Sequence, residues 1–202
     1  MSQEKPIQKL GIFGGSFNPI HRGHLYLADL AKESMSLDQV LFVPAADPPH
    51  KDRRHLALAH HRLAMLELAI QSERDLAVST IELEDNQLSY TIDTLRALGK
   101  RYPNAELHFI MGMDSLRDLP TWKDPEMILG EFSVIAIDRP GIDESRINPV
   151  MVQACHIIRG NPFAISATLI RRRILEKKSI RHLVPNAVGE YISQHNLYQP
   201  QS

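Results

Sequence analysis

The stretch from Leu10 to Leu25 predicts a short buried strand, a glycine-rich turn and the start of a helix. Its first residues are apolar or small, as in a buried strand. Gly14 and Gly15 then allow backbone angles that other residues avoid, and they let a ligand approach the main chain closely. Apolar residues recur at helical spacing from about His21. A strand, a tight turn and a helix N-terminus in this order form a site whose amides and dipole favour phosphate.

The rest of the chain alternates strand-like apolar runs with helical segments. We expect strands near residues 40–45, 76–83, 107–111, 132–137 and 155–158, and helices near 58–71, 91–101, 122–129, 149–154, 166–178 and 186–194. Buried strands that alternate with helices indicate a parallel sheet that is covered on both faces. The sequence therefore predicts a single α/β domain over residues 1–202, a doubly wound, Rossmann-like and mostly parallel sheet with a C-terminal helical part from about residue 165.

Ligands of doubly wound sheets bind at the carboxyl ends of the strands, near the point where the strand order reverses. The loops that carry His21, His50, Asp114 and Trp122 should converge at this edge of the sheet. The sequence thus predicts where the site lies before any of its chemistry is considered.

Composition limits the classes of partner. The 202 residues include 23 Lys and Arg against 24 Asp and Glu, so the net charge of -1 provides no general attraction for nucleic acid or a membrane surface. A single cysteine, Cys155, cannot form an internal disulfide, as expected in a reducing compartment. The first residues lack the apolar core of a signal peptide, and no apolar run approaches the roughly 20 residues of a membrane helix. We expect a cytoplasmic protein, and the oligomeric state, including a homo-oligomer, stays open.

Two histidines follow the glycine-rich turn. His21 and His24 are three residues apart, which places both on one side of the first helical turn. A histidine pair at this spacing also suits a metal site or a purely structural role. However, no cysteine and no nearby carboxylate completes a set of ligands, so we expect no metal site in the chain itself. The strand–glycine–helix context favours phosphate.

A second candidate anion site lies at residues 165–171. Ser166 is a good N-cap, Thr168 falls in the first helical turn, and Arg171 follows within about one turn. Taken alone, this segment is better explained as a capped amphipathic helix with an exposed basic face. A nucleic-acid role for that basic face is disfavoured because the rest of the chain is not basic. Taken together, two anion sites for one polyphosphate suggest nucleotidyl transfer from a nucleoside triphosphate.

Residues 14–24, Gly-Gly-Ser-Phe-Asn-Pro-Ile-His-Arg-Gly-His, and residues 165–171, Ile-Ser-Ala-Thr-Leu-Ile-Arg, resemble the paired signatures of the nucleotidyltransferase superfamily. Further motifs at residues 48–51, 89–91, 109–116, 120–122 and 139–141 resemble those of the bacterial nicotinate-nucleotide adenylyltransferases. The resemblance runs from about residue 10 to residue 198, with the motifs in the order of the family. It implies transfer of AMP from ATP to nicotinate mononucleotide in NAD biosynthesis, which yields nicotinate adenine dinucleotide and pyrophosphate.

The resemblance also implies roles for individual residues. Catalytic roles fall to His21, His24 and Arg171. ATP-binding roles fall to Gly14, Gly15, Ser16, Phe17, His50, Lys51, Gly112, Asp114, Ser166 and Thr168. Contacts to nicotinate mononucleotide fall to Asn18, Tyr90, Thr91, Trp122 and Arg139. Mg²⁺ is expected to be carried by the ATP phosphates, because it gives up its water reluctantly.

Structural alternatives remain open for several of these residues. Asp114 also suits a surface turn, Trp122 suits a partly buried loop anchor, and Tyr90 and Thr91 suit the cap of a helix. The function has two alternatives as well. One is an adenylyltransferase that acts on phosphopantetheine or nicotinamide mononucleotide, and the other is a nucleotide-binding regulator that has lost the reaction. The preference for nicotinate over nicotinamide rests on the resemblance alone.

Overall fold

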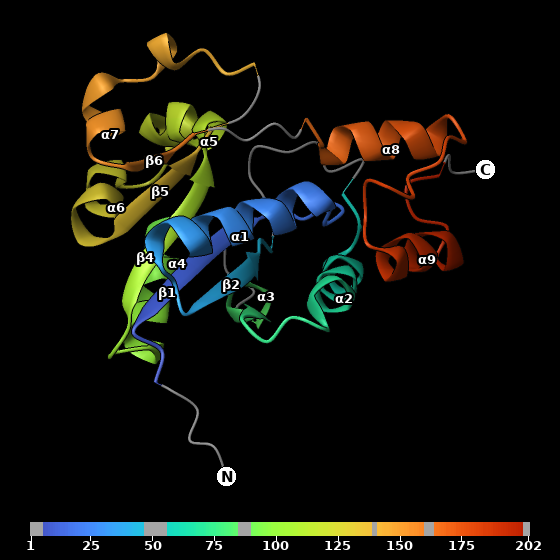
Figure 1. Ribbon diagram of the computed structural model, residues 1–202, viewed down its shortest axis with the longest axis horizontal. Coiled ribbons are helices and arrows are strands. Elements are labelled where there is room, and N and C mark those ends of the chain that lie inside the picture. Colours follow the sequence, from blue (N-terminus) through green and yellow to red (C-terminus); the bar gives the residue numbers. More distant parts are fainter. Residues whose placement is uncertain (1–5, 47–55, 85–89, 139–140, 160–163, 200–202) are drawn as a thin grey trace.

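The structure, a computed structural model, describes residues 6–46, 56–84, 90–138, 141–159 and 164–199. In these ranges the strands form one sheet in which every neighbouring pair is parallel, in the order β3-β2-β1-β4-β5-β6 (Figure 1). The strands are β1 (Lys9–Gly15), β2 (Gln39–Pro44), β3 (Leu76–Val78), β4 (Glu106–Gly112), β5 (Ser133–Ile137) and β6 (His156–Ile158). The parallel sheet expected from the sequence is confirmed.

Helices cover both faces of this sheet. They are α1 (Arg22–Met35), α2 (Ala59–Ile70), α3 (Ile81–Glu84), α4 (Thr91–Arg101), α5 (Met113–Asp118), α6 (Pro125–Glu131), α7 (Pro149–Gln153), α8 (Ala167–Leu175) and α9 (Asn186–Gln194), with 3₁₀ turns at Leu119–Thr121 and Glu144–Arg146. Buried residues of α1, α2, α8 and α9 belong to one core cluster, and those of α4, α5, α6 and α7 belong to the other. This arrangement confirms the doubly wound α/β fold.

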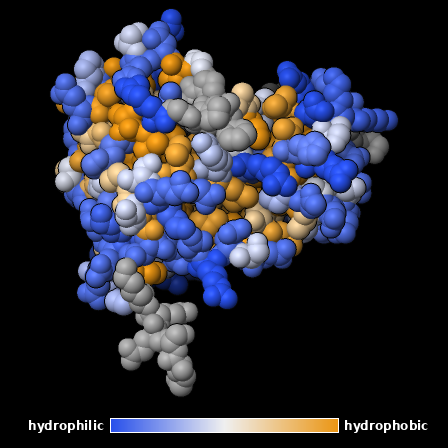
Figure 2. Space-filling model, viewed as in Figure 1, coloured by the Kyte–Doolittle hydropathy of each residue, from blue (hydrophilic) through white to orange (hydrophobic). Residues whose placement is uncertain are grey.

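The two cores follow from the alternation of side chains along the strands. Val40 and Phe42 of β2 belong to the core on the α1 side, whereas Leu41 and Val43 belong to the core on the α4 side. Because successive side chains of a strand point to opposite faces, a strand that is covered on both sides must be apolar throughout. Hydrophilic residues cover most of the surface in view in Figure 2. None of the described helices is long and apolar enough to cross a membrane.

Three expected elements differ from the structure. The helix expected over residues 166–178 ends at Leu175. The strand expected over residues 76–83 ends at Val78, and the four-residue helix α3 follows it. Local bonds explain this early end, because the Ser79 hydroxyl accepts from the Ile81 amide and the Thr80 carbonyl accepts from two amides of α3. The helix expected over residues 122–129 begins only at Pro125, a residue whose fixed φ suits the first turn of a helix.

The strand order reverses between β1 and β4. From β1 the chain moves outward to β2 and β3, and it then returns to β4 on the other side of β1 and continues to β5 and β6. The register that pairs Phe13 with Ile110 sets the carboxyl ends of β1 and β4 side by side. The connections to α1 and α5 diverge from this point, and a crevice opens between them.

Candidate active site

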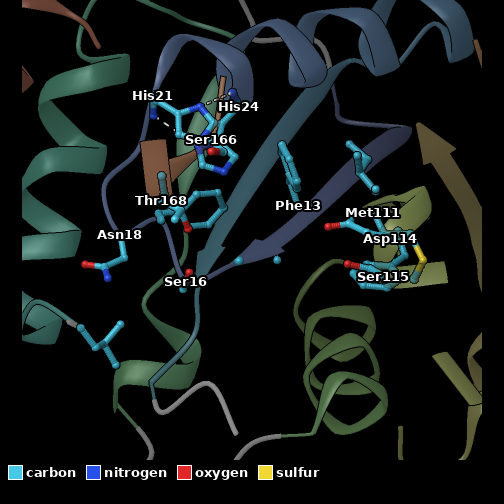
Figure 3. Close-up of a pocket in the computed structure, with 18 of the residues that line it drawn as sticks. Phe13, Ser16, Asn18, His21, His24, Met111, Asp114, Ser115, Ser166 and Thr168 are labelled. Carbon is cyan, nitrogen blue, oxygen red and sulfur yellow. Dashed lines mark hydrogen bonds between the residues drawn. The ribbon is translucent and has the colours of Figure 1, made fainter. Parts of the chain in front are cut away.

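A cleft of about 480 Å³ lies at the carboxyl ends of β1 and β4. It is lined by residues 13–18, His21, His24, Leu56, residues 109–112, Asp114, Ser115, Trp122, residues 166–168 and Arg171. Its volume is typical of a small-molecule site. In Figure 3, His21, His24, Ser166 and Thr168 lie on one side of the cleft, and Met111, Asp114 and Ser115 lie on the other.

The first side of the cleft begins at the N-terminus of α1. His21 is the N-cap, and its Nδ1 accepts a hydrogen bond from the His24 amide at 3.3 Å, while the His24 Nδ1 accepts from the His21 amide at 3.3 Å. Two imidazoles thus form the reciprocal capping pair that serine and glutamate commonly form. Since both Nδ1 atoms accept, the proton of each neutral ring lies on Nε2, and each ring offers an N–H donor there.

The starts of α1 and α8 lie against each other. A Cβ atom on Gly23 would lie 3.4 Å from the Cβ of Ile165 and 3.1 Å from the Nδ1 of His21. A Cβ atom here would crowd the ring of His21, whereas Ile165 lies at an ordinary contact distance, so the segment before α8 packs directly against the first turn of α1. The Arg22 amide also donates to the Leu183 carbonyl at 2.9 Å, which joins α1 to the segment after α8.

The N-terminus of α8 completes this side of the cleft. Ser166 is the N-cap, and its Oγ accepts from the Leu169 amide at 3.1 Å. Arg171 donates to the Asn18 carbonyl at 2.7 Å and to the Thr168 hydroxyl at 3.3 Å. Burial lowers the pKa of the Arg171 guanidinium, which still carries a cation into the cleft. The two segments that the sequence suggested as anion sites, joined by the bond between Arg171 and Asn18 across 153 residues, therefore meet at one cleft.

The other side of the cleft is formed by the chain that follows β4. Gly112 ends the strand and is the N-cap of α5, and Asp114 and Ser115 lie in the first turn of that helix. Trp122 follows a 3₁₀ turn, and its ring lies 6.4 Å from the ring of Phe109. A carboxylate and an indole thus lie across the cleft from the two histidines.

A buried arginine on α2 holds the glycine-rich turn through hydrogen bonds to main-chain carbonyls. Arg62 of α2 is 1% exposed and donates to four main-chain carbonyls, those of Ser16 at 3.0 Å, Ala45 at 2.7 Å, Ala46 at 3.1 Å and Ala57 at 3.0 Å. The sequence contains no signal for this role, because the acceptors are main-chain carbonyls, which every residue has, and not the side chains of a motif. Arg62 therefore ties α2 to the turn that lines the cleft.

Comparison with known proteins identifies the family. A model of the cytidylyltransferase-like family matches residues 12–173. The probable nicotinate-nucleotide adenylyltransferase of Thermomicrobium roseum is 42% identical over 200 residues, which cover 96% of this chain and 92% of that protein. The protein of the same description from Thermus thermophilus is 42% identical over 193 residues, which cover 95% of this chain and all of that one. This chain belongs to the nicotinate-nucleotide adenylyltransferase family.

Solved structures support the fold of this family member. The Plasmodium falciparum nicotinic acid mononucleotide adenylyltransferase complexed with NaAD superimposes with a TM-score of 0.79 at 22% identity, over 95% of this chain and 97% of that one. A putative nicotinate-nucleotide adenylyltransferase from Vibrio parahaemolyticus gives a TM-score of 0.70 at 22% identity, over 95% and 96% of the two chains. These structures show the fold, and the family model and the two relatives above confirm the family resemblance inferred from the sequence motifs.

Some of the residues assigned to nicotinate mononucleotide by resemblance line the cleft, and others do not. Asn18 is in the lining of the cleft, but its side chain points away from the two histidines (Figure 3). Tyr90 and Thr91 begin α4 and are not in the lining that the described residues form. Tyr90 instead lies under Lys123, whose Nζ is 4.6 Å from the centre of the ring. This contact keeps Tyr90 near the loop that carries Trp122.

Three of the assigned residues, His50, Lys51 and Arg139, lie outside the described parts of the chain, as do the Pro48-Pro49 motif and Ser89. Other lining residues were given no role from the sequence: Phe13, Leu56, Phe109, Ile110, Met111, Ser115 and Ala167. Ser115 follows Asp114 directly in a motif that the sequence displays, so its position was available as a signal. Leu56 has no such signal, because it reaches the cleft only through the tertiary fold.

Proposed function

We propose that this protein transfers the adenylyl group of MgATP to nicotinate mononucleotide, which releases pyrophosphate and forms nicotinate adenine dinucleotide. One observation carries the proposal: the N-termini of α1 and α8 meet at a single cleft at the point where the strand order reverses. Each helix start presents amides and a partial positive charge, which together suit a triphosphate. The close relatives described as probable nicotinate-nucleotide adenylyltransferases support the acceptor.

The reaction places modest demands on the protein. A phosphate oxygen of nicotinate mononucleotide attacks the α-phosphorus of ATP, and a new P–O bond forms as the bond from the α-phosphorus to the bridging oxygen breaks. The electron pair of that bond leaves with pyrophosphate. Because the attacking phosphate is already ionised near neutral pH, no strong general base is required. Catalysis then rests on aligning two anions and on stabilising the charge that develops on the leaving group.

The first side of the cleft supplies the groups for the triphosphate. His21 and His24 donate from Nε2 to phosphate oxygens, and His24 stabilises the charge that develops in the transition state. Ser166 and Thr168 bind the β- and γ-phosphates, with Arg171 supplying the cation. Residues 14–17 also line the cleft, and we assign their main-chain amides to the phosphates. Four kinds of donor, imidazole, hydroxyl, guanidinium and amide, therefore converge on one polyanion.

The other side of the cleft supplies the groups for the two nucleosides. Asp114, just after β4, accepts hydrogen bonds from the ribose of ATP, next to Gly112. Trp122 stacks on the pyridine ring, a role that suits a large amphipathic ring on a loop. Tyr90 and Thr91 contribute from the start of α4 beside the Trp122 loop. His50 and Lys51 are assigned to the reacting phosphates and Arg139 to an anion, by family resemblance.

Magnesium enters as part of the MgATP substrate. Among the residues that the structure describes, no group of three or more histidine, cysteine or acidic side chains is close enough to hold a metal ion. Asp114 is the carboxylate in the described lining of the cleft. This donor set fits Mg²⁺ that is held chiefly by phosphates, since Mg²⁺ binds through few carboxylates and retains several waters. The bound ion neutralises phosphate charge.

We further propose that the whole chain is one cytoplasmic domain that acts on small molecules and not on nucleic acid. Both cores share one sheet, which supports a single domain. Burial raises the pKa of the Cys155 thiol to about 11, so little of it is present as the reactive thiolate at neutral pH. The near-zero net charge provides no general attraction for nucleic acid.

The test is pyrophosphate release from MgATP with nicotinate mononucleotide, nicotinamide mononucleotide and phosphopantetheine, assayed in parallel. We expect the highest kcat/KM with nicotinate mononucleotide. A higher kcat/KM with either other acceptor would assign the protein to another adenylyltransferase reaction. ATP binding without pyrophosphate release from any acceptor would instead indicate a regulator that has lost the reaction.

A further inference from the structure

Asn18 joins the glycine-rich turn to three distant parts of the chain. It is 5% exposed. Its carbonyl accepts a hydrogen bond from Arg171 at 2.7 Å, and its side-chain Oδ1 accepts from the Ala57 amide at 3.0 Å and from the Tyr198 hydroxyl at 2.8 Å. Because Oδ1 accepts both of these bonds, the orientation of the carboxamide is set from within the chain.

Tyr198 is the most distant of these partners in sequence. It follows α9, packs against the core on the α1 side, and reaches Asn18 across 180 residues. Burial raises the pKa of the Tyr198 phenol, so the hydroxyl keeps its proton and donates at neutral pH. Its backbone φ of 63° lies in the left-handed region, which is unfavourable for a bulky residue. Such a conformation persists where surrounding contacts hold it.

The bonds to Asn18 form part of a longer chain of contacts. Ala57 donates through its amide to Asn18 and accepts through its carbonyl from Arg62, which also donates to the Ser16 carbonyl. Both ends of the turn at residues 16–18 are therefore held by hydrogen bonds from other segments. Ser16 and Asn18 line the cleft together with Arg171, so a displacement of Asn18 moves groups that face the substrate.

We propose that Tyr198 is a positioning residue for the adenylyl transfer. Its hydroxyl fixes Asn18, and through Asn18 it fixes both the glycine-rich turn and the Arg171 guanidinium relative to the triphosphate. The inference rests on the proposed function for its reaction and on the contacts above for its geometry. Transfer between two bound anions depends steeply on alignment, so a small shift of the turn lowers the rate even though the fold is kept.

A simpler role is that Tyr198 only anchors the segment after α9. The chain offers a matched control for this role, because Tyr191 of α9 also uses its hydroxyl, which lies 2.9 Å from the Nδ1 of His61 on α2. Tyr191 joins the same C-terminal part to the body of the protein, but it is not in the described lining of the cleft and makes no described bond to the turn. Anchoring alone predicts similar effects from both hydroxyls.

The experiment compares Tyr198→Phe with Tyr191→Phe in the full chain. Each change removes one hydroxyl and keeps the ring. We expect Tyr198→Phe to lower kcat/KM for MgATP about fivefold to tenfold, with a fall in kcat at saturating substrates, as the loss of one hydrogen bond allows. Tyr191→Phe should stay within about twofold of wild type on the same scale. Thermal unfolding of both variants reports any loss of stability.

A double-mutant cycle tests whether Tyr198 acts through Asn18. In an Asn18→Ala background, Tyr198→Phe should cause no further loss, because the acceptor is already gone. The proposal is overturned if Tyr198→Phe keeps the wild-type rate, if Tyr191→Phe loses as much, or if the loss is additive with that of Asn18→Ala. If wild type releases no pyrophosphate with any acceptor, the proposed function fails. The same comparison is then made with ATP affinity by calorimetry, in which Tyr198→Phe alone should bind ATP more weakly.

Discussion

The imidazole rings of His21 and His24 stack with their centres 3.6 Å apart and their planes 19° apart. Their Nδ1 atoms are held by main-chain amides, and the ring of Phe17 meets the ring of His24 edge-on at 5.2 Å. Both rings are thus held in place before any substrate binds. Donors that need no reorganisation stabilise a transition state more effectively than mobile ones.

His24→Ala should lower kcat by about 10²–10³-fold, the range expected for loss of one preorganised donor to a developing anion. The variant should still fold, because the loss of one capping contact destabilises a helix by about 1 kcal/mol. The measurement is steady-state pyrophosphate release, with circular dichroism and thermal unfolding on the same samples. His60→Ala serves as the control, since it removes an exposed imidazole from α2. A His24→Ala rate near that of wild type would remove this residue from the chemistry.

Trp122→Ala should raise the KM for nicotinate mononucleotide by about tenfold, because stacking of an aromatic side chain on a base contributes roughly 1–3 kcal/mol. The KM for MgATP should change little. The KM of Trp122→Phe for nicotinate mononucleotide should lie between those of wild type and Trp122→Ala. Initial rates with one substrate varied and the other saturating measure both constants. An unchanged KM for nicotinate mononucleotide would leave the indole as a loop anchor that packs near Phe109.

The sequence predicted the parts of the site that depend on local structure. His21 and Ser166 cap the helices that it placed after them, and the helices expected at residues 91–101 and 186–194 have these same bounds in α4 and α9. Such features are set by residues a few positions apart, so a single sequence contains them. The meeting of α1 with α8 was inferred by pairing the two candidate anion sites on one polyphosphate, and the family resemblance supported that pairing.

The sequence did not predict contacts that exist only through the tertiary fold. Arg62 lies on the buried, largely apolar face of α2, where the sequence alone shows no partner for its charge. The fold brings four main-chain carbonyls within hydrogen-bond distance of it. Tyr198 gives no sign in the sequence of its bond to Asn18, 180 residues away. The short helix α3 replaced an expected strand end because local bonds of Ser79 and Thr80 outweighed strand propensity. Each of these depends on partners that no local pattern names.

Arg62→Met should lower the free energy of unfolding by about 3 kcal/mol, because a hydrogen bond from a charged donor contributes roughly 1.5–3 kcal/mol and a buried acceptor left unsatisfied costs roughly 1–3 kcal/mol. Four main-chain carbonyls would lose their donor, and the bond to the Ser16 carbonyl is fully buried. Arg62→Lys should retain part of the stability, because an ammonium keeps the charge but lacks the planar fork. Urea unfolding at neutral pH measures the change.

The matched control for this prediction is Arg96→Met. Arg96 lies at the surface and donates from Nε to Glu131 at 2.8 Å. Solvent screens such pairs, so we expect little change in stability. Equal losses in Arg62→Met and Arg96→Met would show that the carbonyl contacts of Arg62 contribute no more than an exposed ion pair.

Stability should also depend on pH through His108, on β4 away from the cleft. This residue is 1% exposed; its Nδ1 lies 3.0 Å from the Ser133 hydroxyl, and its Nε2 has no hydrogen-bond partner among the described residues. Burial lowers the pKa of His108, Lys9 and His156 lower it further, and Glu106, whose Oε1 is 3.4 Å from Nε2, opposes them. The folded protein therefore resists protonation at this site.

The sign of the effect follows from linkage. The unfolded chain binds this proton near pH 6.5, whereas the folded protein binds it only at lower pH, so stability falls as the pH decreases through 6.5. One proton contributes a slope of at most about 1.4 kcal/mol per pH unit. His108→Asn should flatten the dependence between about pH 7 and pH 5, as measured by urea unfolding. His182→Asn removes an exposed histidine that does not shift the pKa of His108, so it should keep the wild-type slope. If His108→Asn retains the wild-type slope, the acid sensitivity arises elsewhere in the chain, because it would persist without the His108 imidazole.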